Sequence, residues 1–285
     1  MKILLIGHSV QDHIHQNDEE YVKPGGIYYS VLGLSKIITT DDEIHLVTAL
    51  QKSNEYLFSD VYDKINKYNI SWVDEIPKVH LMIHDSEERT ECYENVSKNL
   101  DINYSILNNY DGILVNMITG FDITLEQLQE IKKHFSGLIY LDVHSLSRGF
   151  DESKTRVFRR IPEFDQWASL VNFIQSNELE TKTLFHSQDE SQIAAEVLER
   201  GTKCFIVTKG DAGARAYFKR NDEIESVFVS AEKIHTLNKV GCGDIFGGVF
   251  LYTFLKTKNI SESLTAANYV AGKSASTQNL KELKL

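Results

Sequence analysis

Short apolar runs alternate with helical patterns along the whole chain, and this alternation constrains the fold more than any other feature. The runs span residues 2–7, 43–49, 112–117, 138–143, 169–175 and 204–210. Most are nearly continuous in apolar residues, which predicts strands buried on both faces of a parallel sheet. Helical patterns, such as 124–135 and 189–200, lie between them. We therefore expect βαβ units with right-handed crossovers, and an α/β fold with a doubly wound, mainly parallel sheet flanked by helices.

Two polar segments interrupt this alternation, at residues 8–24 and 77–100. Apolar residues recur at every second position in the later segment, at Val79, Leu81 and Ile83. This pattern is typical of exposed antiparallel strands. The two segments together predict a small β lid over one edge of the main sheet, placed to close over a substrate.

Composition and charge limit the classes of function. Of the 285 residues, 42% are hydrophobic and 25% are charged, which predicts a soluble, well-packed core. The formal net charge of −11 opposes binding to nucleic acid and to anionic membranes. The longest apolar segment, 245–255, is too short for a membrane span, and no signal-peptide pattern opens the sequence. Three cysteines without close pairing fit a reducing compartment, so we expect a cytoplasmic protein.

The stretch 238–250 concentrates glycines around an aspartate. Gly241 and Gly243 precede an apolar run that has the character of a buried helix. A glycine-rich turn at a helix start directs backbone N–H groups at one point, and the helix dipole adds to their attraction for an anion. Asp244, in the first turn, can cap these N–H groups, or it can act as a general base toward an attacking hydroxyl. Spacing alone leaves both interpretations open.

This stretch resembles the signature of the ribokinase-like (phosphofructokinase B) family of carbohydrate kinases, in which Gly-Ala-Gly-Asp leads into a helix. Cys242 stands in place of the alanine, and Asn238-Lys239 replaces the family's Asp-Thr pair. The resemblance implies one ribokinase-like kinase domain over residues 1–285, with the lid strands inserted at roughly 8–24 and 77–100. It also implies that Asp244 is the catalytic base and that the backbone of its neighbours forms the phosphate site. Those neighbours are Gly241, Cys242 and Gly243.

Further segments match the family in order and imply a substrate site. Asp12 matches the family's sugar-binding aspartate, and Gly25 and Gly26 match its di-glycine segment. Ser30 stands where the family usually has an asparagine. Arg89, on the lid, is a candidate contact for an acidic substrate or a phosphate. The alternative for Arg89 is a solvated lid face shared with its acidic neighbours, which are Glu87, Glu88 and Glu91.

The resemblance also implies a phosphoryl-donor site for ATP. Asn177 and Glu180 match the family's Asn-x-x-Glu motif near the phosphates and Mg²⁺, with Glu180 as the metal residue. The segment 141–148 is similar to another family motif, with His144 replacing an asparagine. The remaining donor-site candidates are Thr208, Gly210 and Gly213, in a nucleotide-binding turn, and Lys239.

Structural alternatives remain open for several of these residues. Glu180 can simply be a helix-start carboxylate favoured by the dipole, and Gly210 and Gly213 can form an ordinary strand–turn–strand. Cys242 is interpreted as a packing residue in place of alanine. The Asn238-Lys239 departure bears on K⁺, which is a further candidate cofactor because that loop helps form the cation site in some relatives.

The resulting functional hypothesis is an ATP-dependent kinase that transfers the γ-phosphoryl group to a hydroxyl of a sugar, sugar acid or cyclitol. The alternatives are a nucleoside kinase, and a non-catalytic relative that binds a metabolite as a sensor. The departures at Ser30 and Asn238-Lys239 favour the sensor, whereas Asp244 favours the kinase. The expected partners are a small polyol substrate and a second copy of the chain bound through the lid.

Ten histidines raise a separate metal hypothesis. His13 and His15, or His80 and His84, share a strand face by period-two alternation. No cysteine or further acidic ligand completes a recognisable zinc pattern in the sequence. We therefore predict that these are exposed lid histidines.

Overall fold

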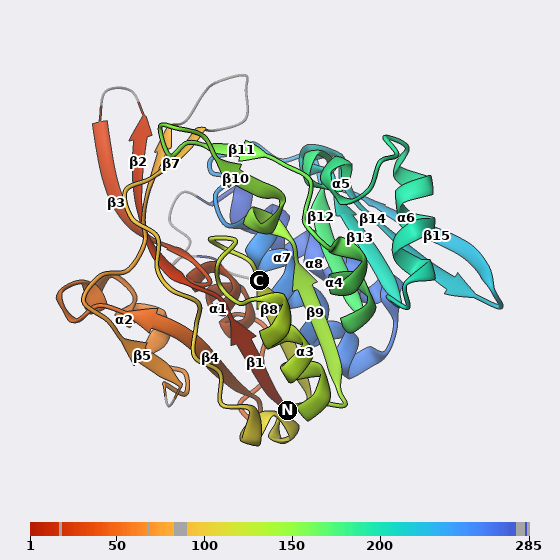
Figure 1. The fold of residues 1–285 in the computed structure, drawn as a ribbon, viewed down its shortest axis with the longest axis horizontal. Helices are drawn as coiled ribbons and strands as arrows, with labels where there is room; N and C mark the ends of the chain where they lie inside the picture. The colour runs from red at the N-terminus through yellow and green to blue at the C-terminus, as the bar shows by residue number, and fades with distance from the viewer. Residues whose placement is uncertain (17–18, 68, 83–89, 278–282, 284–285) are drawn as a thin grey trace.

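The computed structural model describes residues 1–16, 19–67, 69–82, 90–277 and 283. Within these residues, a nine-stranded sheet forms the centre of the molecule, in the order β15-β14-β13-β12-β9-β8-β1-β4-β5 (Figure 1). Its strands are β1 (Lys2–Ile6), β4 (Glu43–Leu50), β5 (Ile70–Trp72), β8 (Gly112–Asn116), β9 (Leu138–Asp142), β12 (Phe173–Asn177), β13 (Cys204–Thr208), β14 (Gly213–Arg220) and β15 (Glu223–Ser230).

The sheet is parallel from β5 to β13, and the hairpin β14–β15 adds two antiparallel strands at one edge. The predicted mainly parallel sheet is therefore confirmed. The run 169–175 was placed too early, because its first residues end a helix and the strand β12 begins at Phe173.

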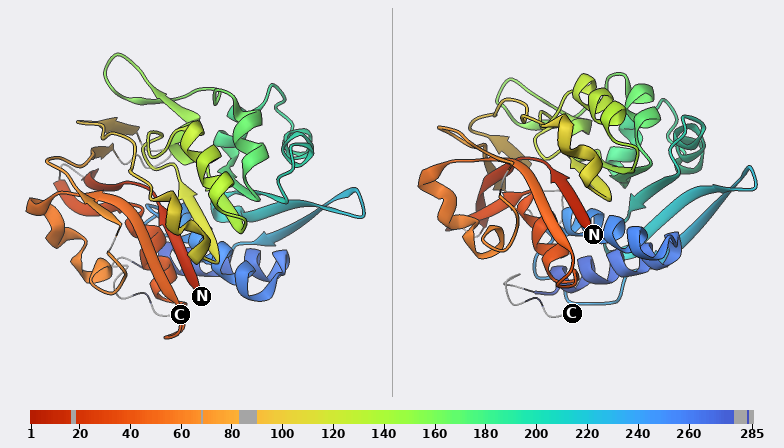
Figure 2. Two further views of the ribbon diagram at one scale, coloured as in Figure 1. Left: turned by 60° about the horizontal axis from the view of Figure 1, so that its bottom comes forward. Right: turned by 90° about the horizontal axis from the view of Figure 1, so that it is seen from below.

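Helices cover both faces of the sheet (Figure 2). One layer consists of α1 (Tyr28–Ser35), α7 (Cys242–Thr257) and α8 (Ile260–Ala275); the other consists of α3 (Leu125–His134), α4 (Phe164–Leu170), α5 (Glu178–Leu184) and α6 (Glu190–Glu199). Alternate residues of β1 enter two separate hydrophobic cores: Ile3 and Leu5 pack with the first layer, and Leu4 and Ile6 with the second. The predicted doubly wound architecture is thus confirmed. None of the helices in the described part of the chain has the length and apolar character that a bilayer span requires.

Local sequence signals account for the helix starts. Thr124 caps α3 in a capping box with Gln127, as the spacing predicted, and Asp189 caps α6. The smaller elements are α2 (Ser59–Tyr62), the strands β10 (Arg148–Phe150) and β11 (Arg156–Phe158), and the 3-10 turns η1 (Lys52–Leu57), η2 (Tyr104–Asn109), η3 (His144–Ser147) and η4 (Gly210–Ala212).

A second, four-stranded sheet forms a lid, in the order β3-β2-β6-β7, at the upper left of Figure 1. Its strands are β2 (Ser9–Gln16), β3 (Glu19–Gly26), β6 (Lys78–Met82) and β7 (Thr90–Tyr93). The pairs β2–β3 and β6–β7 are antiparallel, as predicted, but the central pair β2–β6 is parallel. This correction has a physical reason, because β2 and β6 come from distant segments and local alternation carries no information on how they pair.

Candidate active site

Polar side chains gather at the carboxyl ends of the parallel strands. Asn116 ends β8 opposite Asp142 at the end of β9, and Asn177 ends β12 opposite Thr208 at the end of β13. Ligands of open α/β sheets bind at this edge, where loops and helix starts converge. The helix α7 begins at the same place, and its first residues are the predicted phosphate site.

The N-terminus of α7 is opened by a glycine in a left-handed conformation. Gly241 has φ +80°, and a Cβ at this position would overlap the ring of Tyr29. Only glycine combines this dihedral angle with so close an approach. The amides of Gly243 and Asp244 lie in the first turn of a 16-residue helix, where backbone N–H groups have no acceptor within the helix. Together with the helix dipole, they can attract an anion in a chain of net negative charge.

Cys242 contributes less to this site than expected. Its amide N–H donates to the carbonyl of Lys239 at 3.4 Å, so this amide of the predicted phosphate site already has an acceptor in the preceding turn. Its Sγ lies 3.6 Å from the Ser274 hydroxyl and 3.8 Å from the Asn238 carbonyl oxygen. The side chain therefore packs between the loop and α8, which fits the packing interpretation.

Asp244 is 7% exposed and its carboxylate is held by a residue from the main sheet. The Nδ2 of Asn116 donates to Asp244 Oδ1 at 2.7 Å. On the backbone side, the hydroxyl of Ser30 donates to the Asp244 carbonyl oxygen at 3.0 Å. Two elements thus fix the position of Asp244: β8 contacts its carboxylate, and α1 contacts its backbone carbonyl.

The Asp244 carboxylate borders a narrow cavity of about 30 Å³ between the lid, the start of α7 and the end of β8. The lining that bears on chemistry consists of Asp12, Tyr29, Glu91, Tyr93, His144 and Asp244. A cavity of this size admits roughly two water molecules. The cavity as it stands is therefore too small for a molecule of the size of a sugar.

The predicted substrate residues are only partly assembled around this cavity. Asp12 and Gly26 line it, and Gly25 lies under the Asp12 carboxylate, where a Cβ would overlap the carboxylate oxygens. Ser30 is fully buried against α7 and lies outside the lining formed by the described residues, so it contacts that helix instead of the cavity. Arg89 lies outside the described residues.

The interpretation of Glu91 as part of a solvated face is wrong. Glu91 is 6% exposed and lines the cavity, together with Tyr93 from the same strand. Burial, reinforced by the Glu91 charge, raises the pKa of Tyr93 well above its usual value, so the phenol stays neutral. The period-two pattern of β7, extended from Tyr93 back to Glu91, could have identified this inward position.

Asn177 and Glu180 form the capping box of α5. Asn177 Oδ1 accepts from the amides of Leu179 and Glu180 at 2.9 and 2.8 Å, and Glu180 Oε2 accepts from the Asn177 amide at 2.8 Å. Glu180 Oε1 accepts from Arg148 Nη1 at 3.0 Å, in a buried ion pair. Both oxygens of Glu180 therefore have structural partners, and the helix-start interpretation holds for this residue whether or not it also serves a metal.

Three carboxylates nevertheless lie close enough to influence one another. Burial is the main cause of a raised pKa of Asp142, and the charges of Glu180 and Asp244 add to it. Gln175 Nε2 donates to Asp142 Oδ2 at 2.9 Å and orients the group. A divalent cation would offset this repulsion, and oxygen-rich surroundings are what Mg²⁺ prefers. The residues present therefore fit Mg²⁺ in this region.

The predicted nucleotide turn lies at the same sheet edge. Gly210 has φ +53° and faces open space, whereas a Cβ at Gly213 would overlap the Val229 carbonyl oxygen. Gly213 is thus required by the close approach of β14 and β15, as the structural alternative stated. Lys239 Nζ lies 3.3 Å from Asp211 Oδ2, which links the loop before α7 to this turn.

Sequence reasoning did not select Asn116 or Gln175 as site residues, and it included Asp142 only as part of the motif at 141–148. Each is a buried polar residue at or near the carboxyl end of an apolar strand. That position is a usable signal, because a buried polar group requires a partner and strand ends of a parallel sheet share one edge.

Comparisons of sequence support a relationship to known kinases. Residues 148–283 match the pfkB family of carbohydrate kinases, and this region includes α7 and Asp244. A stretch of 127 residues, 45% of this chain, is 28% identical to an uncharacterised sugar kinase of Archaeoglobus fulgidus. That match spans 49%, about half, of the length of the curated relative.

Solved structures resemble the whole chain at low sequence identity. A pyrophosphate-dependent kinase in the ribokinase family, complexed with a pyrophosphate analog and myo-inositol, has a TM-score of 0.75 and 13% identity over 96% of this chain and 95% of its own. Arabidopsis thaliana ribokinase, complexed with ribose and ATP, has a TM-score of 0.76 and 14% identity over 99% of this chain and 95% of its own. Ribokinase from Thermotoga maritima has a TM-score of 0.75 and 18% identity over 100% and 95%.

These likenesses show that the chain has the ribokinase fold, as the motifs predicted. The match of residues 148–283 to the pfkB family agrees with this fold and with the family that the motifs predicted.

Proposed function

We propose that the protein transfers the γ-phosphoryl group of ATP to a hydroxyl of a sugar, sugar acid or cyclitol. The observation that carries this proposal is the position of the Asp244 carboxylate, at the glycine-opened start of α7 and in the same cavity as Asp12 of the lid. Similar structures bind substrates of this kind: one is complexed with myo-inositol, and another with ribose and ATP.

Asp244 is the base in this mechanism. Its carboxylate accepts the proton of the attacking hydroxyl, a contribution typically of about 10²–10⁴-fold. The hydrogen bond from Asn116 to Oδ1, at 2.7 Å, holds the carboxylate in one orientation toward the acceptor. Asp12 binds another hydroxyl of the same substrate from the lid side.

The amides of Gly243 and Asp244 stabilise the charge on the transferred phosphoryl oxygens. Loss of one such donor typically costs about 3 kcal/mol in the transition state. Mg²⁺ would supply charge neutralisation for the phosphates, and Asp142 and Glu180 are the carboxylates that would hold it, largely through water. Alignment and charge neutralisation are what phosphoryl transfer chiefly requires of a protein.

Closure of the lid excludes water from this reaction. We infer that the cavity of about 30 Å³, which Tyr93 and Val79 line on the lid side, corresponds to a closed arrangement. Opening admits the polyol, and closure then brings Asp12 against it while bulk water, the competing acceptor, is expelled.

A nucleoside is a second candidate substrate, favoured by one observation. Tyr93 brings an aromatic ring from the lid to the cavity wall, where it can stack on a base. The hydroxyl of Tyr93 donates to the Ile118 carbonyl at 3.3 Å, so the ring is fixed before any ligand binds.

The experiment is a turnover assay with sugars, sugar acids, cyclitols and nucleosides as acceptors, and ATP or pyrophosphate as donor. We expect a phosphorylated polyol, detected by ³¹P NMR, with ATP as the better donor. Asp244→Asn should lower kcat at least about 100-fold while donor affinity and folding are retained. The matched control is Glu130→Gln, a surface carboxylate on α3, which should leave kcat unchanged. A wild-type protein that forms no phosphorylated product with any acceptor and either donor would overturn the proposal.

A further inference from the structure

The outer face of the lid gathers histidines from two strands and a glutamate from a third. On β2, Val10, Asp12 and Ile14 are buried toward the body of the protein, so His13 and His15 point to the opposite face. The parallel pairing of β2 with β6 sets His80 directly beside His13. The β2–β3 hairpin brings Glu20 beside this pair, from the position opposite His15.

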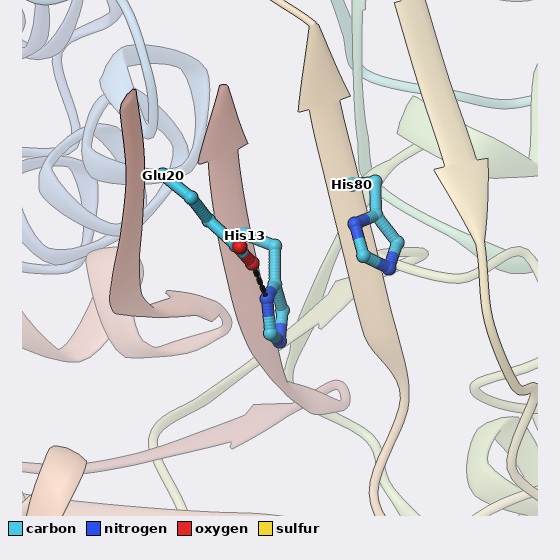
Figure 3. A group of neighbouring side chains, drawn as sticks. All are labelled: His13, Glu20 and His80. Carbon is cyan, nitrogen blue, oxygen red and sulfur yellow. Dashed lines mark hydrogen bonds and ion pairs between the residues drawn. The ribbon is translucent and has the colours of Figure 1, made fainter. Parts of the chain in front are cut away.

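The side chains converge on this face, as Figure 3 shows. The carboxylate of Glu20 is hydrogen-bonded to Nδ1 of His13, and the ring of His80 lies on the neighbouring strand with its centroid 4.9 Å from that of His13. One ligand atom from each of Glu20, His13 and His80 lies within 4.8 Å of the other two. The structure thus supplies the acidic ligand whose absence from the sequence pattern had argued against a metal. His84, the other histidine considered there, lies outside the described residues.

We propose that His13, Glu20 and His80 bind one divalent transition-metal ion per chain, of the class represented by Zn²⁺. Two imidazoles and a carboxylate are a characteristic Zn²⁺ donor set, whereas Mg²⁺ prefers oxygen ligands alone. Ligand atoms around a tetrahedral Zn²⁺ lie about 3.4 Å apart, given metal–ligand distances of about 2.1 Å. The present spacing reaches that geometry through small side-chain rotations, in which the ion replaces the proton between Glu20 and His13.

Neighbouring groups support the ligands in the way that outer-shell residues of metal sites do. The amide of Gln11 lies 2.9 Å from Nε2 of His13, and an amide can pair with that nitrogen as donor or acceptor. Glu94 Oε2 lies 3.5 Å from Nε2 of His80, an arrangement that orients the ring and leaves Nδ1 toward the cluster. Nε2 of His15 lies 3.0 Å from this Nδ1 and offers a fourth ligand.

Metal binding here would join β3, β2 and β6 on the face opposite the cavity. His13 follows Asp12 directly, and the two side chains point to opposite faces of β2. A bound ion would therefore brace the strand that carries Asp12 without entering the active-site cavity. The inference does not depend on the proposed phosphoryl transfer.

The test is Zn²⁺ binding to the purified full chain by isothermal titration calorimetry, with Co²⁺ absorption as a report on ligand geometry. We expect one equivalent per chain, unaffected by millimolar Mg²⁺. His80→Ala and Glu20→Gln should each weaken Zn²⁺ binding at least about tenfold, since loss even of outer-shell partners costs 10–100-fold. Both residues are on the lid surface, so we expect both variants to fold, and circular dichroism checks this.

The matched control is His134→Ala. His134 is an exposed histidine with a carboxylate, Glu130, 3.9 Å away on α3, so it presents the same residue types without the second imidazole. The affinity of this variant should equal that of the wild type. The proposal is overturned if His134→Ala weakens binding as much as His80→Ala, if the wild type binds no Zn²⁺ in the micromolar range, or if native mass spectrometry shows one ion shared by two chains.

Discussion

Replacing Asn116 by aspartate tests how the base is positioned. In the native protein, Asn116 Nδ2 donates to Asp244 Oδ1 at 2.7 Å, inside the protein. Asn116→Asp places a second carboxylate oxygen at this distance. Two unit charges 2.7 Å apart repel by about 6 kcal/mol at an effective dielectric constant of about 20. The pair avoids this cost by sharing one proton, as closely spaced carboxylates do.

The predicted consequence is a shift of the pH profile. Sharing a proton raises the pKa of the Asp244 carboxyl, so the base becomes available only at higher pH. We expect the acid limb of kcat/KM to move upward by at least about one pH unit, and activity at pH 7 to fall at least about tenfold. Activity should recover in part toward pH 9, where the shared proton dissociates.

Two further variants separate the effect of the added charge at position 116 from the effect of losing the hydrogen bond to Asp244. Asn116→Ala removes the donor without adding a charge, so activity should fall and the acid limb should move upward by less than in Asn116→Asp. Asn259→Asp makes the same chemical change at the N-cap of α8, where aspartate is an equally good cap, and should leave the whole profile unchanged. An Asn116→Asp profile that coincides with the wild type would refute the reasoning, because it would mean that Asp244 does not titrate as the base.

Two other predictions concern stability. Gly241→Ala should destabilise the protein by at least about 2 kcal/mol in urea unfolding, because φ is +80° and the added methyl group overlaps Tyr29. Gly272→Ala, in the last turn of α8 with open space around it, should instead stabilise by about 0.5–1 kcal/mol, and equal effects of the two changes would contradict the structure. Asp142→Asn should raise Tm at pH 7 in the absence of divalent metal. The reason is that burial raises the pKa of Asp142 in the folded state. The wild-type protein therefore loses stability as the pH rises above the pKa that this carboxyl has in the unfolded chain. The gain in Tm should vanish near pH 4, where unfolded aspartate also holds its proton, and a gain independent of pH would argue against this origin.

The main sheet could be predicted because its signal is local. Continuous apolar runs such as 112–117 and 204–210 correspond to β8 and β13 with their bounds nearly unchanged. The exception, 169–175, joins the apolar end of α4 to the start of β12, and periodicity alone cannot divide a continuous run between a helix and a strand.

Less of the site could be predicted from the sequence, because its contacts join residues far apart in the chain. The position of Asp244 followed from the glycine-rich turn, but its partner Asn116 lies 128 residues away and is recognisable only once β8 and α7 meet. The sequence interpretation assigned Glu91 to an acidic surface because of its charge and did not use its position in the strand alternation, although the residue is buried. The cluster on the outer lid needed the parallel pairing of β2 with β6, which no local pattern encodes.

The packing of α1 against α7 has a consequence for the biosynthesis of this protein. The two helices are separated by nearly three quarters of the chain, yet Leu34 and Ile245 belong to one core, and Ser30 reaches the backbone of Asp244. Throughout most of translation, the nascent N-terminal half therefore presents an uncovered apolar surface, which exposes it to self-association and to binding by chaperones. A stop codon anywhere before α7 would yield a fragment that both lacks the proton acceptor and leaves that surface bare.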